Sequence, residues 1–306
     1  MKVLIAGGSG LIGRALTRSL LADGHRVWIL TRSPSKARLP EGAIAVGWDA
    51  RTTRGWGELV NELDVVVNLA GEILANWPWT EAKKQKFMNS RVDASRAVTE
   101  AIRAASPRPK VFVQGSAMGF YGPHSSEERV TEDFPPADDF GARVCRNNEA
   151  ASDSVEEMGV RRVILRTSIA LSRQNLILIL MALPAQLFVG GKLGDGTQGF
   201  SWIHIDDHIA AIRFLMENEK ARGAFNLAAP NPVSSEEFLR TIAKVLRRPF
   251  WFPVPAFLLR FVLGEMSSLV LEGQYVAPKR LQEMGFKFKF EQAESALRDL
   301  YKRQVI

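Results

Sequence analysis

The stretch Lys2-Val-Leu-Ile-Ala-Gly7-Gly8-Ser9-Gly10-Leu11-Ile12-Gly13 decides the fold of this chain. An apolar run, Val3 to Ala6, leads directly into glycines and then into a segment whose apolar residues recur with helical spacing. Gly7 and Gly10 allow a tight turn close to a pyrophosphate, and Gly13 allows close packing of a helix whose positive N-terminal end faces the phosphates. This context predicts a dinucleotide-binding site, not a glycine-rich turn that binds nothing.

The rest of the chain continues the alternation of strands and helices. Continuous apolar runs such as residues 65–67 and 111–113 favour strands that are covered on both faces. The alternation becomes irregular after Leu171, and Pro-rich helical segments follow Pro230. We therefore predict an α/β fold, a Rossmann-type doubly wound parallel sheet with a smaller, mostly helical C-terminal lobe.

The predicted division assigns residues 1–170 and 203–228 to the Rossmann domain. Residues 171–202 and 229–306 form the smaller substrate lobe. We expect this lobe to pack over the C-terminal edge of the sheet, because ligands bind at that edge in open α/β folds.

Composition narrows the class of protein. The 306 residues are 46% hydrophobic and 24% charged, as in an ordinary globular protein. The single cysteine, Cys145, excludes an internal disulfide framework and favours a reducing compartment, so we expect a cytoplasmic protein. The four histidines show no ligand spacing, and we predict no metal site. The net charge of +7 is spread along the chain, which argues against a nucleic-acid surface. The apolar start is needed as the first strand, so we predict no export signal.

Two apolar stretches, residues 176–189 and 250–263, raise the question of a membrane. Both contain proline, and neither reaches the ~18 residues that a membrane span needs. We predict that they form buried helices, a pocket wall or an interface with a second copy or a protein partner. Peripheral membrane contact is the alternative.

The end of the second predicted strand bears on the choice of cofactor. An acidic residue there favours NAD by binding the ribose 2′-hydroxyl, but this chain has Thr31 and Arg32. Arg32 can pair with a 2′-phosphate, which predicts NADP(H). The alternative is that Arg32 is a solvated surface residue.

Motifs along the whole chain resemble those of a known family. They are Asn68-Leu-Ala-Gly-Glu72, Asn89-Ser-Arg91, Gly115-Ser-Ala-Met-Gly-Phe-Tyr-Gly122, Leu165-Arg-Thr167, Gly194-Asp-Gly-Thr-Gln198, Ser201-Trp-Ile-His-Ile-Asp-Asp207 and a tail from Gly264 to Phe286. The chain resembles the atypical extended short-chain dehydrogenase/reductases, and more narrowly the YfcH-like (SulA-type) epimerase-related family with its own C-terminal domain.

The resemblance implies NADP binding. Leu69, Ala70 and Gly71 would line the adenosine and pyrophosphate edge, and Arg91 would reach toward the cofactor; the end of a buried strand is the alternative interpretation of residues 68–71. The predicted cofactor-binding residues are Gly7, Ser9, Gly10, Leu11, Ile12, Gly13, Thr31, Arg32, Leu69, Ala70, Gly71, Arg91, Gly115 and Arg166.

The catalytic Tyr-x-x-x-Lys pair of the superfamily is missing. Phe140 and Val144 stand at the corresponding positions, and a phenyl ring cannot transfer a proton. The match Tyr275 to Lys279 contains Pro278, which is unfavourable inside a helix, so we regard it as a decoy.

If the protein is catalytic without this pair, we predict three catalytic residues: Ser116 binding a substrate oxygen, Tyr121 transferring a proton, and His204 assisting. Ala117 is the alternative to Ser116, and Asp206 the alternative to His204. Ordinary structural roles remain open for all of these. The predicted substrate would lie between the sheet edge and the C-terminal lobe, near Ser116, Tyr121, Phe200, Trp202 and His204.

Other patterns favour structural roles. Glu127-Glu128 and Glu132-Asp133 resemble solvated loop charges. Trp77 and Trp79 are predicted to form a pocket wall or to pack. The residues from Ser234 to Glu237 match a capping box at a helix start.

Two functions follow. The first is an NADP(H)-dependent oxidoreductase or epimerase that transfers a hydride to or from a small carbonyl or carbinol compound. The alternative is a non-catalytic NADP(H)-binding regulator, linked to division by the family's name, that uses its apolar C-terminal helices to bind a partner.

Overall fold

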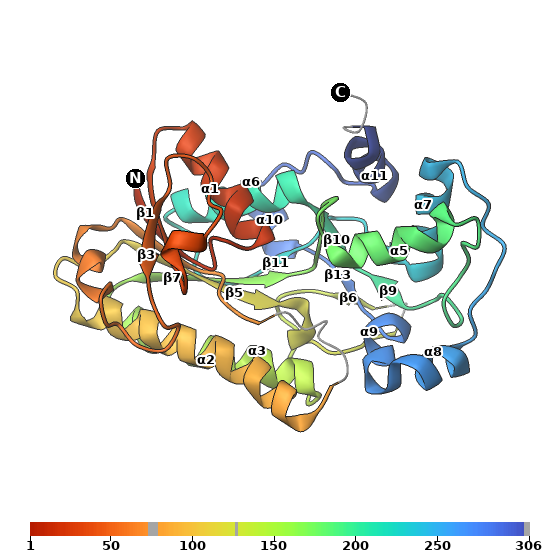
Figure 1. Ribbon diagram of the computed structural model, residues 1–306, viewed down its shortest axis with the longest axis horizontal. Helices are drawn as coiled ribbons and strands as arrows, with labels where there is room; N and C mark the ends of the chain where they lie inside the picture. Colours follow the sequence, from red (N-terminus) through yellow and green to blue (C-terminus); the bar gives the residue numbers. More distant parts are fainter. Residues whose placement is uncertain (73–78, 126–127, 303–306) are drawn as a thin grey trace.

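A parallel sheet with helices on both faces forms the centre of the molecule (Figure 1). The computed structural model describes residues 1–72, 79–125 and 128–302. The sheet order is β3-β2-β1-β4-β5-β7-β11, and every pairing is parallel. Its strands are β1 (Lys2–Ala6), β2 (Arg26–Thr31), β3 (Ile44–Gly47), β4 (Val65–Asn68), β5 (Val111–Ala117), β7 (Arg161–Thr167) and β11 (Gly223–Leu227). This order, which runs outward from β1 in both directions, confirms the predicted Rossmann-type fold.

Two hydrophobic cores cover the two faces of the sheet. On one face lie α1 (Leu11–Ala22), α6 (Ile205–Glu217) and α10 (Lys279–Glu283), and on the other lie α2 (Glu81–Ala104) and α4 (Ser154–Glu157). Strand β1 shows how the pleat divides the cores, because Val3 and Ile5 belong to the first core and Leu4 to the second. The continuous apolar runs are therefore strands buried on both faces, as predicted.

The stretch from Phe140 to Met158 forms two helices. The structure has α3 (Phe140–Ala150) and then α4, with residues 151–153 between them. Asp139 caps α3 by accepting a hydrogen bond from the backbone N–H of Ala142. Helix α3 packs on α2 and follows it along the lower face of the sheet in Figure 1.

The C-terminal region has a third core and is largely helical, as predicted, and three two-stranded sheets join parts of it to each other or to neighbouring segments. The pairs are β10 (Trp202–His204) with β8 (Ile169–Leu171), β12 (Val233–Ser234) with β9 (Gly199–Phe200), and β13 (Tyr275–Val276) with β6 (Arg129–Val130). Its helices are α5 (Leu176–Gln186), α7 (Ser235–Leu246), α8 (Ala256–Leu263), α9 (Ser268–Leu271) and α11 (Ala293–Lys302). Short 3₁₀ turns cover Pro34–Lys36, Gly57–Glu62, Met118–Phe120 and Gly264–Ser267.

The predicted domain division stays a prediction, and one detail departs from it. Leu281 and Phe286 fall in the predicted lobe, yet they pack in the core of the main sheet. Ser234 caps α7 by accepting the N–H of Glu237, as the capping-box pattern predicts for that end of the helix.

The two long apolar stretches are less buried than predicted. Helix α5 buries only Leu178, Ala182 and Ala185, and α8 buries none of its residues. Within the described ranges, no helix is both long enough and apolar enough to cross a membrane.

Candidate functional site

The turn between β1 and α1 has no room for side chains at two of its glycines. Gly7 has a φ of +78°, and a Cβ there would lie 2.6 Å from the carbonyl carbon of Leu69. A Cβ on Gly13 would lie 2.4 Å from the carbonyl oxygen of Gly7. The N–H of Gly10 donates to that same oxygen at 3.0 Å and closes the turn. Glycine is therefore required at positions 7 and 13, because a Cβ there would collide with backbone atoms, which cannot move aside as a side chain can.

The N-terminal end of α1 suits an anion. Gly10 caps the helix without a side-chain hydrogen bond, and the first turn contains no acidic residue. Leu11 and Ile12 begin the helix, so their N–H groups and that of Gly13 have no partner within its first turn. Ser9 is exposed beside them. A pyrophosphate fits such an end because the N–H groups and the helix dipole both favour negative charge.

The loop after β4 packs against this turn. The N–H of Leu69 donates to the carbonyl of Ala6 at 2.8 Å, and the N–H of Ala70 donates to Asn68 Oδ1 at 3.1 Å. Gly71 lies under the guanidinium of Arg91, since a Cβ there would be 2.8 Å from Arg91 Cζ.

Arg91 is held on both sides. It donates to the carbonyl oxygens of Phe87 and Glu72 at 3.2 and 3.0 Å, and its guanidinium lies 3.7 Å from the centre of the Phe87 ring. Burial lowers its pKa to about 10. Arg91 thus holds the loop after β4, next to the residues predicted to line the cofactor.

The end of β2 carries an exposed cation beside a carboxylate. Thr31 accepts a long hydrogen bond of 3.4 Å from the N–H of Ser33, and the Arg32 side chain is 74% exposed. Arg32 Nη1 lies 3.7 Å from Glu72 Oε1, and Lys86 Nζ lies 3.6 Å from the same oxygen. The sequence shows no carboxylate at the end of β2. Glu72 follows β4, and only the fold brings it near Arg32.

A buried polar network fixes the ends of β4 and β5. Asn68 Nδ2 donates to Ser95 Oγ and to Gln114 Oε1, and Asn148 Oδ1 accepts from Ser95 Oγ at 2.7 Å. Asn148 Nδ2 also donates to the carbonyl of Gly115 at 2.8 Å. A Cβ on Gly115 would lie 2.9 Å from the carbonyl oxygen of Asn68, so Gly115 allows the close approach of the two chain segments.

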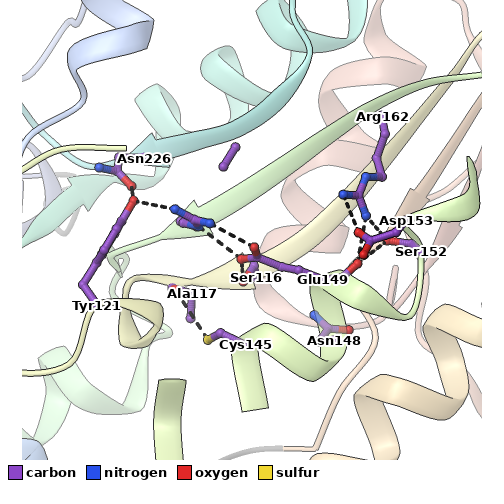
Figure 2. Close-up of polar contacts among 12 residues, drawn as sticks. Ser116, Ala117, Tyr121, Cys145, Asn148, Glu149, Ser152, Asp153, Arg162 and Asn226 are labelled. Atoms are coloured by element: carbon purple, nitrogen blue, oxygen red, sulfur yellow. Dashed lines mark hydrogen bonds and ion pairs between the residues drawn. The ribbon is translucent and has the colours of Figure 1, made fainter. Parts of the chain in front are cut away.

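Ser116 leads into a chain of charged and polar groups (Figure 2). Its Oγ donates to Glu149 Oε1 at 2.6 Å. Arg166 Nε and Nη2 donate to the two oxygens of Glu149 at 3.2 and 3.0 Å, and its Nη1 donates to the Tyr121 hydroxyl at 3.0 Å. That hydroxyl donates to Asn226 Oδ1 at 2.7 Å. Ser116 is half-buried, whereas the rest of the chain is buried.

Two predicted site residues are corrected by this packing. Tyr121 is not in a cleft: it is 1% exposed, and its hydroxyl has two protein partners. Burial raises its pKa to about 12, so it holds its proton tightly. Arg166, predicted to bind the cofactor, directs its donors to Glu149 and Tyr121 and lies 3.4 Å from the centre of the Phe120 ring.

The charge of Arg166 is stabilised within this chain of contacts. Burial by itself lowers the pKa of Arg166, but the hydrogen bonds and the charge of Glu149 raise it above its usual value. The sequence contained one signal for Glu149. It lies one turn after the buried Cys145 on α3, on a face where an unpaired carboxylate is costly.

His204 is also corrected. It is fully buried and caps α6, because its Nδ1 accepts the backbone N–H of Asp206 at 3.1 Å. Asp206 therefore lies inside the first turn and is not the cap. His204 Nε2 lies 3.3 Å from Asp299 Oδ2, and its ring packs 4.0 Å from that of Phe290. These contacts tie α6 to the C-terminal segment.

The apolar residues predicted beside the substrate are buried as well. Phe200 stacks on Phe238 with 4.1 Å between ring centres, and Trp202 is completely enclosed. Both belong to the third core, so of the five residues predicted near the substrate only Ser116 keeps partial exposure.

Phe140 and Val144, at the positions of the superfamily's tyrosine and lysine, pack among other side chains. Val144 is buried, and the Phe140 ring lies 5.9 Å from that of Trp79. Tyr275 and Lys279 do not pair: the Tyr275 hydroxyl donates to the carbonyl of Thr197, and Lys279 Nζ contacts Asp133 at 2.7 Å.

Three remaining predictions have different outcomes. Trp77 and Glu127 lie outside the described residues. Glu132 is not a solvated charge, because its carboxylate accepts the N–H of Asn226 at 2.9 Å, and burial raises its pKa.

One group of potential metal ligands gathers among the described residues. His204, Asp206 and Asp299 each offer an atom within 4.8 Å of the others. Lys289 Nζ lies 3.8 Å from Asp206 Oδ2, and His204 Nδ1 already accepts a backbone N–H. The arrangement is accounted for by a helix cap and ion pairs.

Comparisons with known proteins agree with this geometry. Residues 3–228 match the NAD dependent epimerase/dehydratase family, and residues 254–300 match a domain of unknown function, DUF1731. The epimerase family protein YfhF of Bacillus subtilis is 38% identical over 301 residues, which are 98% of each chain.

Solved structures give the same result. The crystal structure of human epimerase family protein SDR39U1 with NADPH has a TM-score of 0.85 and 32% identity, over 99% of each chain. A nucleoside-diphosphate sugar epimerase from Corynebacterium glutamicum has a TM-score of 0.78 and 30% identity, over 98% of this chain and 58% of that one. The chain therefore belongs to the NAD dependent epimerase/dehydratase family and carries that family's Rossmann-type fold together with a DUF1731 region.

Proposed function

We propose that this protein is an NADP(H)-dependent oxidoreductase or epimerase that transfers a hydride to or from a small carbonyl or carbinol compound. The proposal rests on two observations. Gly7 and Gly13, between β1 and the first turn of α1, leave no space for a side chain. The N-terminal end of α1 beside them has no side-chain cap. The narrower YfcH-like assignment is supported by the DUF1731 region, and the human relative is described with NADPH. A cytoplasmic location, inferred from the single cysteine, stays a prediction.

The residues fit a phosphorylated dinucleotide. Gly10 to Gly13 would hold the pyrophosphate, Leu69 to Gly71 would line the adenosine side, and Arg32 would pair with the 2′-phosphate. Since Glu72 lies 3.7 Å from Arg32, the phosphate must compete with that carboxylate. When bound, the nicotinamide supplies or accepts the hydride.

Ser116 is the proposed catalytic residue, and Glu149 works through it. The Ser116 hydroxyl donates its proton to Glu149, so toward a substrate the oxygen offers lone pairs. That arrangement suits a carbinol, whose O–H donates to Ser116 Oγ while the serine proton moves to the carboxylate. Arg166 stabilises the negative charge of Glu149 before the transfer.

The missing Tyr-x-x-x-Lys pair favours a second candidate. A non-catalytic NADP(H)-binding regulator would keep the glycine turn and would need no proton donor. The burial of Tyr121 and Val144 supports this alternative, because it removes two groups from contact with a substrate.

Turnover with panels of alcohols plus NADP⁺, and of carbonyl compounds plus NADPH, tests the proposal. The absorbance of reduced nicotinamide is the measurement. We expect Ser116→Ala to lower kcat by about 10²- to 10⁴-fold, and Glu149→Gln to lower it in the same direction. Tyr121→Phe is expected to keep most of the activity, because the Tyr121 side chain is buried and its hydroxyl is engaged by Asn226 and Arg166.

Glu62→Gln is the matched control, since Glu62 is an exposed carboxylate that contacts Lys2 at 3.6 Å, at the start of β1 and therefore at the opposite edge of the sheet from Ser116. Tight NADPH binding without turnover of any compound would favour the regulator. Failure to bind either nucleotide would reject both candidates.

A further inference from the structure

The C-terminal region exposes many large apolar side chains on segments that lie close together. We define the apolar face as the exposed side chains of α5, residues 187–189, residues 251–252 and α8. Its most prominent members are Phe261, Phe257, Trp251 and Leu187, which are 87%, 73%, 63% and 62% exposed. Large apolar side chains scattered singly on a surface are ordinary, but a contiguous group of this kind marks an interaction site.

The face is held together by backbone contacts. Gly190 pairs with Phe250 and Leu193 with Val254 in isolated bridges, so the segment after α5 and the segment before α8 run side by side. Trp251 Nε1 donates to the carbonyl of Phe188 at 2.9 Å. Figure 1 shows α5 and α8 at the same end of the molecule, opposite the edge strand β3. The aromatic side chains therefore project from a structured surface.

Helix α8 is unusual within this face. Seven of the eight residues in its sequence, Ala-Phe-Leu-Leu-Arg-Phe-Val-Leu, are apolar, yet it buries none of them; Phe257, Leu258, Phe261 and Val262 are exposed, whereas residues 256, 259 and 263 are partly covered. Since most helices in folded proteins gain their stability by burying an apolar stripe, a helix of this composition at the surface indicates an apolar contact outside the chain.

Charge identifies the occupant. Residues 174–194 and 238–264 contain no aspartate or glutamate, but they contain Lys192, Arg240, Lys244, Arg247, Arg248 and Arg260. Arg240 and Lys244 pair with Glu236 and Glu294 outside these segments. Arg248 lies 4.4 Å from the centre of the Phe188 ring, and Arg260 is an exposed residue of α8. Arg248 and Arg260 therefore place positive charge on the apolar face itself.

We propose that this face docks on an anionic lipid surface, with the aromatic side chains entering the interface and the arginines contacting the headgroups. Aromatic and aliphatic side chains on one side of an interfacial helix, together with Lys or Arg, are the features that membrane-surface elements combine. A second copy fits less well, because a two-fold interface would enclose the arginines of both copies, and residues 174–194 and 238–264 supply no carboxylate to pair with them. The proposal is independent of the oxidoreductase activity.

Vesicle flotation tests the proposal with the full chain. We expect binding to phosphatidylcholine vesicles that contain phosphatidylglycerol, little binding to phosphatidylcholine alone, and weaker binding at high salt. The double variant Phe257→Ser/Phe261→Ser is expected to lose at least about tenfold in partitioning. Its matched control is Ile44→Ser, because Ile44 is an exposed apolar residue on β3 at the other end of the sheet.

The charged residues are tested separately. Arg248→Glu/Arg260→Glu is expected to weaken binding to the anionic vesicles by at least about tenfold, whereas Arg54→Glu, at an exposed position far from the face, leaves it nearly unchanged. Circular dichroism checks that each variant is folded. A difference in quenching by brominated lipid between the parent chain and Trp251→Phe shows whether Trp251 enters the bilayer.

Three results would overturn the proposal. The first is the absence of binding to anionic vesicles. The second is an equal loss of vesicle binding in the variants and in their controls. The third is a dimer in light scattering without lipid that Phe257→Ser/Phe261→Ser converts to a monomer, which would identify the face as an interface between two copies.

Discussion

Arg32 is the residue on which the cofactor preference depends. Its side chain is exposed at the end of β2, and its guanidinium lies 3.7 Å from a carboxylate oxygen of Glu72, which is longer than a hydrogen bond. An ion pair of this kind at the surface contributes little to stability. A 2′-phosphate carries more charge and accepts several hydrogen bonds, so it is expected to displace Glu72 from Arg32.

Removing Arg32 is expected to change nucleotide choice. We predict that Arg32→Ala weakens NADPH binding by about ten- to hundredfold and leaves NADH binding nearly the same, because one charge-assisted contact is lost only with the phosphorylated form. Isothermal titration calorimetry with both nucleotides measures this. Arg54→Ala serves as the control, and an equal loss of affinity for NADPH and NADH would contradict the prediction.

Glu149 and Arg166 illustrate the limit of prediction at single residues. The sequence places both on regular elements, but only the packing of α3 against the sheet joins their side chains and directs the donors of Arg166 to Glu149. Ser116, near the C-terminal end of β5, was predicted as a candidate from the family resemblance. Its partner could not be predicted, because Glu149 is 33 residues away in the chain.

At the scale of elements, backbone crowding constrains the β1-turn-α1 unit to glycine at particular positions. Gly7 needs both a positive φ and an empty space beside Leu69. Gly24, after α1, has a similar φ of +74° but has no atom within 4 Å of its Cβ position. A comparison of Gly7 with Gly24 therefore separates two contributions to the unfolding free energy, that of the backbone conformation and that of crowding.

We predict different effects for alanine at these two glycines. Gly24→Ala is expected to cost about 1 kcal/mol of unfolding free energy, from its backbone conformation alone. Gly7→Ala is expected to cost about 1–3 kcal/mol more, from crowding against backbone, and to weaken NADPH binding. Urea unfolding and nucleotide titration measure the two effects. Equal destabilisation by both variants would show that crowding at Gly7 is unimportant.

At the scale of the whole molecule, the junction of α6 with the sheet contains a buried histidine. His208 is completely buried, its Nε2 lies 3.2 Å from Thr167 Oγ1, and burial lowers its pKa to about 3. In the unfolded chain a histidine has a pKa near 6.5. Between these two values the unfolded chain binds a proton that the folded protein does not, so acid favours unfolding.

The stability of the molecule is therefore expected to fall below about pH 6.5. We predict that His208 contributes a loss of about 2 kcal/mol of unfolding free energy between about pH 7 and about pH 5. Urea unfolding of the parent chain and of His208→Gln at several pH values measures the difference in slope. His124→Gln, at a half-buried surface histidine, is the control. Identical slopes for the parent and His208→Gln would contradict the prediction.

The fold and the glycine turn were predictable from sequence because they depend on local patterns. Apolar runs identified β1, β4 and β5, and their spacing with helices predicted a parallel sheet. The start of α7 at Ser234 was predictable for the same reason. The exposure of α8 was not, because an apolar helix has the same sequence pattern whether a core covers it or solvent surrounds it.

The amino-acid sequence by itself determined the Rossmann-type sheet, the position of the nucleotide turn and the loss of the Tyr-x-x-x-Lys pair. These depend on residue type and short-range spacing, where backbone sterics and side-chain chemistry act locally. Only the tertiary structure decided that Tyr121, Arg166 and His204 are buried in contacts with other elements, and that Glu149 faces Ser116. Burial and partner choice depend on which distant segments the completed fold brings into contact.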